Sequence, residues 1–335
     1  MAVTINDVAK KAGVSHTTVS WVIHNDPRIT KKTKDKVNKA IEELNYHPNY
    51  NARSLVKGKT DAIAVVSSFF STNFELNILR GIEDAMGQDS KGFNLNLYSS
   101  ANKSNEVLNE ILFGKRADAV ILLCDTPSQK VINAYNKHNI PLVLVENYHD
   151  ELISVKSDSI SGGEAAGEYL INSGRKNIGI VVEELNGDDI PGLSQVERMI
   201  GFEKSFEKHG LTVNKDLIFE INSFRMEAGR EIAQNIINNN IIIDSIFCAA
   251  GDKVALGIID ELKHNNIRVP DDISIIGFDD IDVADLVSPS LSTIRQDLHG
   301  LGSTAYDLAI KSIEKQAIDE KHIQYETFFI KRGSA

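Results

Sequence analysis

Long apolar runs are missing from this sequence of 335 residues, in which no window reaches about 18 uninterrupted apolar residues. A membrane-spanning helix is therefore not expected. The first residues (MAVTINDVAKKAGVS) lack the apolar core of a signal peptide, so the sequence predicts a cytoplasmic protein. Cysteine is scarce: only Cys124 and Cys248 are present, each in a short apolar run that predicts a buried side chain. Neither a metal site nor a redox centre is predicted.

Signatures of catalysis are also missing from the sequence. Nothing matches a phosphate-binding P-loop, a GxGxxG turn, a nucleophile elbow or an HExxH motif, and the nine histidines lack metal-ligand spacing. The paired acids of GFDDIDVAD and ENYHDE resemble the general acid and base of a glycosidase, but nothing else completes such a site. The sequence therefore predicts a protein that is not an enzyme and needs no cofactor.

An overall basic excess is lacking too, because the formal net charge is −11. With 42% hydrophobic and 25% charged residues, the composition is typical of a soluble globular chain of two or three domains. The charge is uneven, however. Residues 1–60 hold 11 Lys and Arg against 5 Asp and Glu, a net of +6, which leaves −17 for the remainder. A basic head on an acidic body favours a polyanionic partner, and a merely solvated lysine-rich helical face is the alternative.

The basic head has the spacing of a helix-turn-helix. Thr4 has the form of an N-cap with an acid three residues later, which predicts a helix over 5–12. Gly13 permits a tight turn, and Ser15 can cap a second helix. A third helix is expected over 31–45, and together the three indicate a DNA-binding unit. A purely structural helical hairpin is the alternative.

The second helix leaves several polar side chains and one aromatic side chain facing outward. A recognition helix enters the major groove by its N-terminal residues, which favours His16 and Thr17 for base contacts and leaves Ser15 or Thr18 for phosphates. His16 and Thr17 as ordinary surface residues are the alternative, and Trp21 can instead pack on the core of the head or on DNA sugars. The candidate DNA-binding residues of the head are Thr4, Ser15, His16, Thr17, Thr18 and Trp21.

A linker with a conditional helix follows the head. Pro48 stops the third helix, and the amphipathic stretch 50–56 is too short to be stable alone. The sequence therefore predicts a head over 1–47 and a hinge over 48–60, and a plain flexible tether is the alternative.

From residue 61 onward, short apolar runs alternate with helical stretches in two similar series, which predicts an α/β body over 61–335. Strands are expected near 62–67, 94–98, 118–123 and 142–146, then near 177–182, 217–221, 245–248 and 273–277. Helices are expected near 74–88, 104–114, 128–138, 161–173, 195–209, 226–238 and 252–264. Without a phosphate-binding turn, the body is predicted to be a binding module.

The run from TINDVAKKAGVSHTTVSWVIHNDP to NYHPNYNARSL resembles the DNA-binding head and hinge of the lactose-repressor (LacI/GalR) family almost position by position. The resemblance implies that the hinge folds only on operator DNA, pairs with its dimer mate and wedges a leucine, here Leu55, into the minor groove. Asn51, Ala52 and Arg53 match other hinge positions. The family more often has a basic residue or histidine at the position of Trp21.

The resemblance continues through the body in RGIEDAM, RMIGFEKSF, GDKVALGIIDEL and IGFDDIDVADLVSPSLSTIRQD. It implies a periplasmic-binding-protein-like (type I) effector domain, with two lobes joined by three crossovers and an effector in the cleft. The expected N-lobe covers about 61–160 and 294–320, and the expected C-lobe about 161–293 and 321–332.

The resemblance also assigns effector-binding roles. Arg198 would hydrogen-bond the effector, and Asp279 would accept from ligand hydroxyl or ring N–H groups; surface ion pairing and helix capping are their respective alternatives. Asp280 is the preferred helix cap. Two aromatic residues would stack on the ligand or lie at the cleft edge, unless they serve the core, and two positions depart from the residues usual in the family. The six candidates are Phe74, Glu146, Arg198, Phe224, Gly251 and Asp279.

The sequence thus predicts an effector-responsive DNA-binding regulator, a repressor of carbohydrate-utilisation genes that a small sugar releases from its operator. A purine-responsive regulator, or one corepressed by a phosphocarrier protein, is the alternative. Because one head covers one half-site, a homodimer on a palindromic operator is expected.

Overall fold

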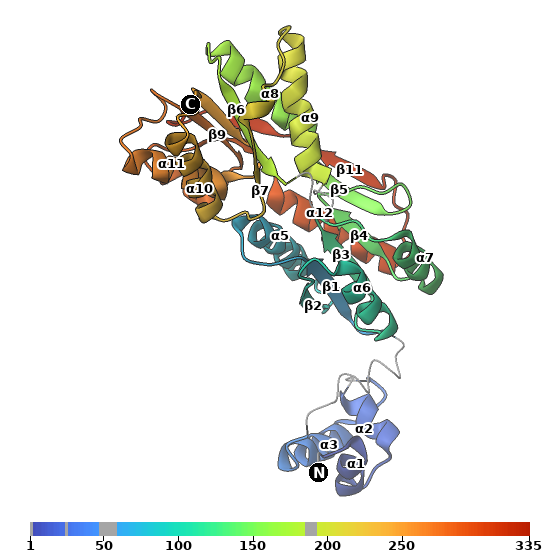
Figure 1. Ribbon diagram of the computed structural model, residues 1–335. Helices are drawn as coiled ribbons and strands as arrows, with labels where there is room; N and C mark the ends of the chain where they lie inside the picture. The colour runs from blue at the N-terminus through green and yellow to red at the C-terminus, as the bar shows by residue number, and fades with distance from the viewer. Residues whose placement is uncertain (1–2, 24–25, 47–58, 185–192) are drawn as a thin grey trace. The chain divides into compact units, whose positions relative to one another are not determined.

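Figure 1 shows the computed structural model of the chain, which describes residues 3–23, 26–46, 59–184 and 193–335. The chain divides into two compact units, Met1–Thr60 and Asp61–Ala335. Among the described residues, no helix has the length and apolar character needed to cross a bilayer.

The head is a three-helix unit, as the sequence predicted. Its helices are α1 (Ile5–Ala12), α2 (His16–Ile23) and α3 (Lys31–Glu43). The N–H and hydroxyl groups of Thr4 both donate to the Asp7 carboxylate, at 2.9 and 2.7 Å, and so fix the start of α1. Gly13 ends α1 with φ at +61°, a conformation that most side chains disfavour. The helices enclose a small core of Val8, Ala9, Ala12, Val19, Val22, Val37, Ala40 and Tyr46.

The body contains two six-stranded sheets, which define two lobes. The N-lobe sheet has the order β11-β5-β4-β3-β1-β2, and the C-lobe sheet has the order β12-β10-β9-β8-β6-β7. All pairings are parallel except β10 with β12. The N-lobe strands are β1 (Ala62–Ser67), β2 (Asn94–Ser99), β3 (Ala119–Leu123), β4 (Leu142–Val145), β5 (Ile153–Ser157) and β11 (His322–Tyr325). The C-lobe strands are β6 (Ile178–Glu183), β7 (Ile218–Ile221), β8 (Ser245–Cys248), β9 (Ser274–Asp279), β10 (Ser292–Arg295) and β12 (Phe328–Ile330).

Helices cover both faces of each sheet, which is why the central strands are apolar without interruption. In β1, Ile63 and Val65 pack with α5 and α12, whereas Ala64 and Val66 pack with α6 and α7. The N-lobe helices are α5 (Asn73–Asp89), α6 (Ser104–Phe113), α7 (Gln129–His138) and α12 (Leu298–Ile313). The C-lobe helices are α8 (Ser159–Asn172), α9 (Leu193–Lys208), α10 (Met226–Asn238) and α11 (Asp252–His264), with short 3₁₀ turns η1 (Lys215–Leu217) and η2 (Asp282–Asp285).

The chain crosses between the lobes three times, at Asp158, at 296–297 and at 326–327, which confirms the two-lobed fold. The assignment of 321–332 to the C-lobe was wrong in its first part. His322 of β11 pairs with Ser154 of β5, so this strand extends the N-lobe sheet. The assignment of residues 294 and 295 to the N-lobe was also wrong, because Ile294 pairs with Phe278 of β9 in the C-lobe sheet.

Candidate functional site

The N-terminal end of α2 presents the predicted DNA-reading residues. The Thr18 N–H donates to the Ser15 hydroxyl at 3.1 Å, and the two hydroxyl groups lie 2.9 Å apart. Ser15 thus caps the helix, as predicted from its position. His16 and Thr17 are exposed at the first turn of α2, the part of such a helix that reaches base edges.

Trp21 is 40% exposed, so its side chain is not packed in the core of the head. The Arg28 guanidinium lies 5.1 Å from the centre of the indole ring, a cation–π geometry. Arg28 also binds Asp26 at 2.7 Å, and this contact lowers the pKa of Asp26 to about 2. The indole is therefore partly exposed and lies beside a cation.

The predicted hinge residues lie outside the described part of the chain. Their roles in the minor groove therefore stay predictions. They are Asn51, Ala52, Arg53 and Leu55.

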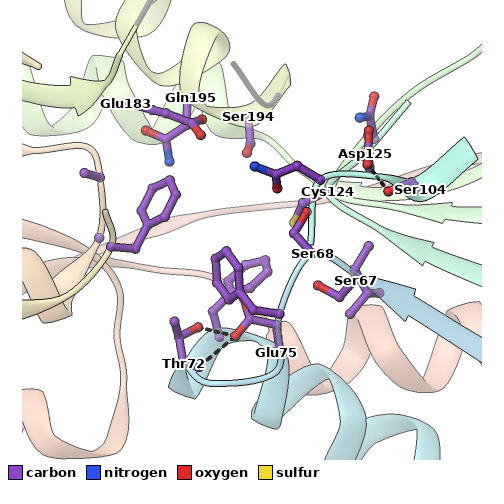
Figure 2. A pocket seen from close by; sticks show the side chains of 18 of the residues that line it. Ser67, Ser68, Thr72, Glu75, Ser104, Cys124, Asp125, Glu183, Ser194 and Gln195 are labelled. Carbon is purple, nitrogen blue, oxygen red and sulfur yellow. Dashed lines mark hydrogen bonds between the residues drawn. The ribbon is translucent and has the colours of Figure 1, made fainter. Parts of the chain in front are cut away.

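A cleft of about 710 Å³ lies between the two lobes of the body, where the carboxyl ends of several parallel strands meet. Side chains from both lobes line it (Figure 2). Five of the six candidate effector-binding residues are among them, namely Phe74, Arg198, Phe224, Gly251 and Asp279.

Arg198, on α9, is 3% exposed, so the alternative of a surface ion pair is wrong. Its Nη1 donates to the Ala249 carbonyl oxygen at 2.7 Å, and its Nη2 lies 3.6 Å from Asp279 Oδ1. The guanidinium also stacks on Phe278, 3.7 Å from the ring centre. Nε has no partner among the described residues. This fixed, partly unsatisfied fork can bind a polar ligand in the cleft.

Asp279 ends β9 and faces Arg198 across the cleft floor. Its Oδ1 accepts a 2.7 Å hydrogen bond from Gln296 Nε2, in the second crossover. Burial raises the pKa of Asp279 to about 7, although Arg198 and Gln296 favour the ionised form. The close approach of Gly251 depends on its lack of a side chain, because its φ is +110° and a Cβ there would lie 2.9 Å from Asp279 Oδ2.

Two acids, Asp280 and Asp252, hold the loop that follows Asp279, a role that the sequence did not suggest. Asp280 was expected to cap a helix, but instead accepts from Arg295 at 2.6 Å and pairs with Arg332 at 2.7 Å. Asp252 at the start of α11 is fully buried, and accepts from the Ile281 N–H at 2.9 Å and from the hydroxyl of Thr293, in β10, at 2.6 Å. These two acids fasten the loop after β9 to neighbouring strands, and so hold Asp279 in place.

Glu146 is the candidate that is not among the residues lining the cleft, and its effector-binding role stays a prediction. It is 2% exposed, and its Oε1 accepts the Ser157 N–H at 2.6 Å, next to the first crossover. Its Oε2 has no partner among the described residues. Burial raises the pKa of Glu146, while Arg198 acts in the opposite direction. Glu146 therefore lies behind the wall and influences the cleft through charge.

The aromatic residues face each other from the two lobes. Phe224 lies with its ring centre 6.5 Å from that of Phe69, a cleft residue that sequence reasoning missed. Phe224 and Phe74 also pack against the cores of their lobes, so each combines the core role with the cleft role. The Phe69–Phe224 pair offers apolar faces on which a ring can stack.

Three further cleft residues were missed or misjudged. Glu75 is 6% exposed and accepts from the N–H and hydroxyl of Thr72, while burial raises its pKa. Gln195 is 7% exposed, and its Oε1 has no partner among the described residues. Cys124 was expected to be buried, but it follows β3 with φ at +55° and is exposed in the cleft. Cys248 is buried, as predicted.

The charged residues of the cleft are predominantly acidic. Its walls include the acids Glu75, Glu106, Asp125, Glu183 and Asp279 and the bases Lys103, Arg198 and Lys253. Arg198 already faces Asp279, and Lys253 lies close enough to Glu75 to oppose in part the burial that raises the pKa of Glu75. The cleft therefore suits an uncharged ligand that is rich in hydroxyl groups better than an anion.

Comparisons with known proteins match both units. Residues 4–49 match the family model described as "Bacterial regulatory proteins, lacI family", and residues 168–335 match "Periplasmic binding protein-like domain". The chain is 33% identical over 326 residues to the HTH-type transcriptional repressor PurR of Histophilus somni (strain 2336), covering 96% of this chain and 95% of that protein. It is 32% identical over 339 residues to the HTH-type transcriptional regulator RegA of Clostridium saccharobutylicum, covering 100% and 99%.

Two solved structures share the fold. A lac repressor dimer bound to operator and the anti-inducer ONPF matches with a TM-score of 0.82 at 24% identity, covering 100% of this chain and 99% of that chain. A complex of the transcriptional regulator CelR with cellobiose matches with a TM-score of 0.72 at 24% identity, covering 99% and 100%.

Proposed function

Because the chain belongs to the lacI family of bacterial regulatory proteins, we propose that it represses carbohydrate-utilisation genes until a small sugar releases it from its operator. Family membership makes it a DNA-binding transcriptional regulator that responds to a small molecule. The observation that carries the proposal is the cluster of Arg198, Asp279 and Phe224, named here the aromatic end of the cleft. It combines a planar donor fork, an acceptor and a stacking face, a set of groups that can bind a sugar ring.

The DNA partner follows from the head. We propose that His16 and Thr17 read bases, and that Ser15, Thr18 and Trp21 contact the DNA backbone, while Thr4 fixes the first helix beside it. Two heads are needed to read a palindromic operator, so the regulator acts as a homodimer.

A purine is the second candidate effector. Phe69 and Phe224 face each other with ring centres 6.5 Å apart, so both could contact a flat heterocycle. Relatives at 33–34% identity carry the name PurR. The acids around Arg198 could accept ring N–H groups as well as sugar hydroxyl groups.

The test needs an operator, which selection from a random duplex library with the full chain would supply. Fluorescence anisotropy would then follow release of the labelled operator during titration with sugars or with hypoxanthine and guanine. The proposal expects a sugar to lower operator affinity, by roughly 5–150-fold for typical couplings. A purine that strengthens operator binding, with no response to any sugar, would replace the sugar proposal with the purine one.

A further inference from the structure

The cleft extends well beyond its aromatic end. Figure 2 shows Glu183 and Gln195 on one side of the view and Asp125 and Ser104 on the other, with Ser68 between them. Small-molecule sites usually measure roughly 300–1,000 Å³, and this cleft, at about 710 Å³, lies just above the middle of that range. A ligand confined to the aromatic end would leave the opposite side to water.

The opposite side is formed by N-lobe residues near the carboxyl ends of β1 and β3 and the first turn of α6. Hydroxyl, amide and carboxylate groups are interspersed there, as in a surface that binds the hydroxyl groups of a sugar. We name this side the polar arm and define it by Ser68, Ser104, Asn105, Asp125 and Thr126.

The polar arm retains hydrogen-bonding capacity after its internal contacts are made. The Thr126 hydroxyl accepts from Asn147 Nδ2 at 3.0 Å, so its own hydrogen can be donated to a ligand. Asn105 Oδ1 accepts the Ser128 N–H at 2.8 Å, which leaves the Asn105 amide N–H groups to donate. Each carboxylate oxygen of Asp125 accepts one protein hydrogen bond and has room for a second.

The charge of the polar arm selects against anions. The N-terminus of α6 would attract a phosphate group through its free backbone N–H groups. However, Asp125 already places a carboxylate there, hydrogen-bonded to the hydroxyl of Ser104, the first residue of α6. A phosphorylated sugar would bring its charge against this carboxylate and against Glu106, and Lys103, which also lines the cleft at the start of α6, offsets only one of these two negative charges.

We propose that the effector is an uncharged oligosaccharide of at least two rings, with one ring at the aromatic end and the next in the polar arm. The inference rests on the proposed function, because it specifies the class of sugar that the same cleft binds. The arm supplies specificity for length: a single ring cannot satisfy both sides at once.

Calorimetry on the full chain would test the proposal with a fixed set of probes: glucose, galactose, glucose 6-phosphate, lactose, maltose, cellobiose and maltotriose. We expect one oligosaccharide to bind at least about tenfold more tightly than its component monosaccharides, and glucose 6-phosphate to bind no more tightly than glucose. A monosaccharide that binds as tightly as the best oligosaccharide would overturn the length inference and leave the sugar-regulated repressor intact. Binding of no sugar in the set would overturn both.

Two variants locate the second ring. Thr126→Val removes the Thr126 hydroxyl, one of the donors of the polar arm, and replaces it with a side chain of the same shape. This change should weaken binding of the best oligosaccharide roughly fivefold to tenfold, as expected for one lost hydrogen bond. Affinity for the monosaccharide should stay within about twofold. Thr212→Val is the matched control, because Thr212 is an exposed threonine outside the cleft. Equal loss for both ligands, or no loss for either, would contradict the proposal.

Ser68→Trp would fill the polar arm. The oligosaccharide should then lose its advantage and bind no more tightly than the monosaccharide, while operator binding persists as evidence of a folded chain. Retention of the full oligosaccharide preference in this variant would place the second ring elsewhere and refute the arm.

Discussion

We expect Asp279, the buried acid at the cleft floor, to make the stability of the folded chain depend on pH. Asp279 has a pKa of about 7 in the folded chain, against 3.8 for an unperturbed aspartate. Because the folded-state value is raised, folding favours the protonated carboxyl group. Its contribution to stability is therefore complete below pH 3.8 and is lost as the pH rises toward about 7. Each unit of difference corresponds to about 1.36 kcal/mol, so the loss is at most about 4 kcal/mol.

Asp279→Asn removes this titration and keeps the local geometry, because an asparagine oxygen can still accept from Gln296 Nε2. We expect the wild-type chain to lose more stability than the variant between pH 4 and pH 8, by about 2–4 kcal/mol. Urea unfolding followed by circular dichroism over this range would measure the difference. Asp319→Asn, at an exposed position, serves as the control. Parallel profiles for wild type and Asp279→Asn would refute the reasoning that burial of this carboxyl group dominates its titration.

The remaining predictions concern communication between effector and DNA. His16→Ala and Thr17→Ala should each relax base preference at neighbouring operator positions by roughly 1–3 kcal/mol, measured by binding to operator variants; an unchanged ranking would remove these residues from base reading. Leu55→Ala should lessen the operator bend, seen by energy transfer between the DNA ends, and lower specific affinity while leaving effector binding to the free protein unchanged. Gln296→Leu removes the hydrogen bond between the second crossover and Asp279. It should reduce the effector's influence on operator affinity more than it reduces the affinity for the effector itself, and titrations of the effector with and without operator would measure both quantities. Sedimentation should show a dimer at micromolar concentration, and a stable monomer would contradict the two-head requirement.

Local patterns predicted most of the fold because most of its elements are locally encoded. The helix over 5–12 and the strand near 62–67 were predicted with their observed bounds, since a capping signal and a continuous apolar run mark them. Four strands, β5, β10, β11 and β12, and helix α12 were not predicted. His322–Tyr325 and Phe328–Ile330 are short and lie at sheet edges, and only pairing with distant strands makes them strands.

The cleft was predictable only in part for a similar reason. The resemblance of single positions located Arg198 and Asp279, but the sequence does not show that Phe69 of one lobe faces Phe224 of the other. Cys124 was misjudged because its apolar run ends one residue earlier, at Leu123, and a left-handed backbone turn then carries the thiol into the cleft. The contact between Phe69 and Phe224 and the exposure of Cys124 depend on how the two lobes come together in the folded chain, so no local sequence pattern predicts them.

The glycine at the cleft floor has a consequence for anyone who wishes to convert this regulator into a biosensor for another compound. Saturation libraries usually include every residue that lines a pocket. At Gly251, nearly all members of such a library would be lost, because any side chain meets a backbone angle of +110° and the Asp279 carboxylate at 2.9 Å. Sequence diversity is better placed at Ser68 and Thr126, which belong to the polar arm and have backbone conformations that ordinary side chains adopt. New ligand preferences can be sought there while Asp279 and its hydrogen bond to Gln296 are left unchanged.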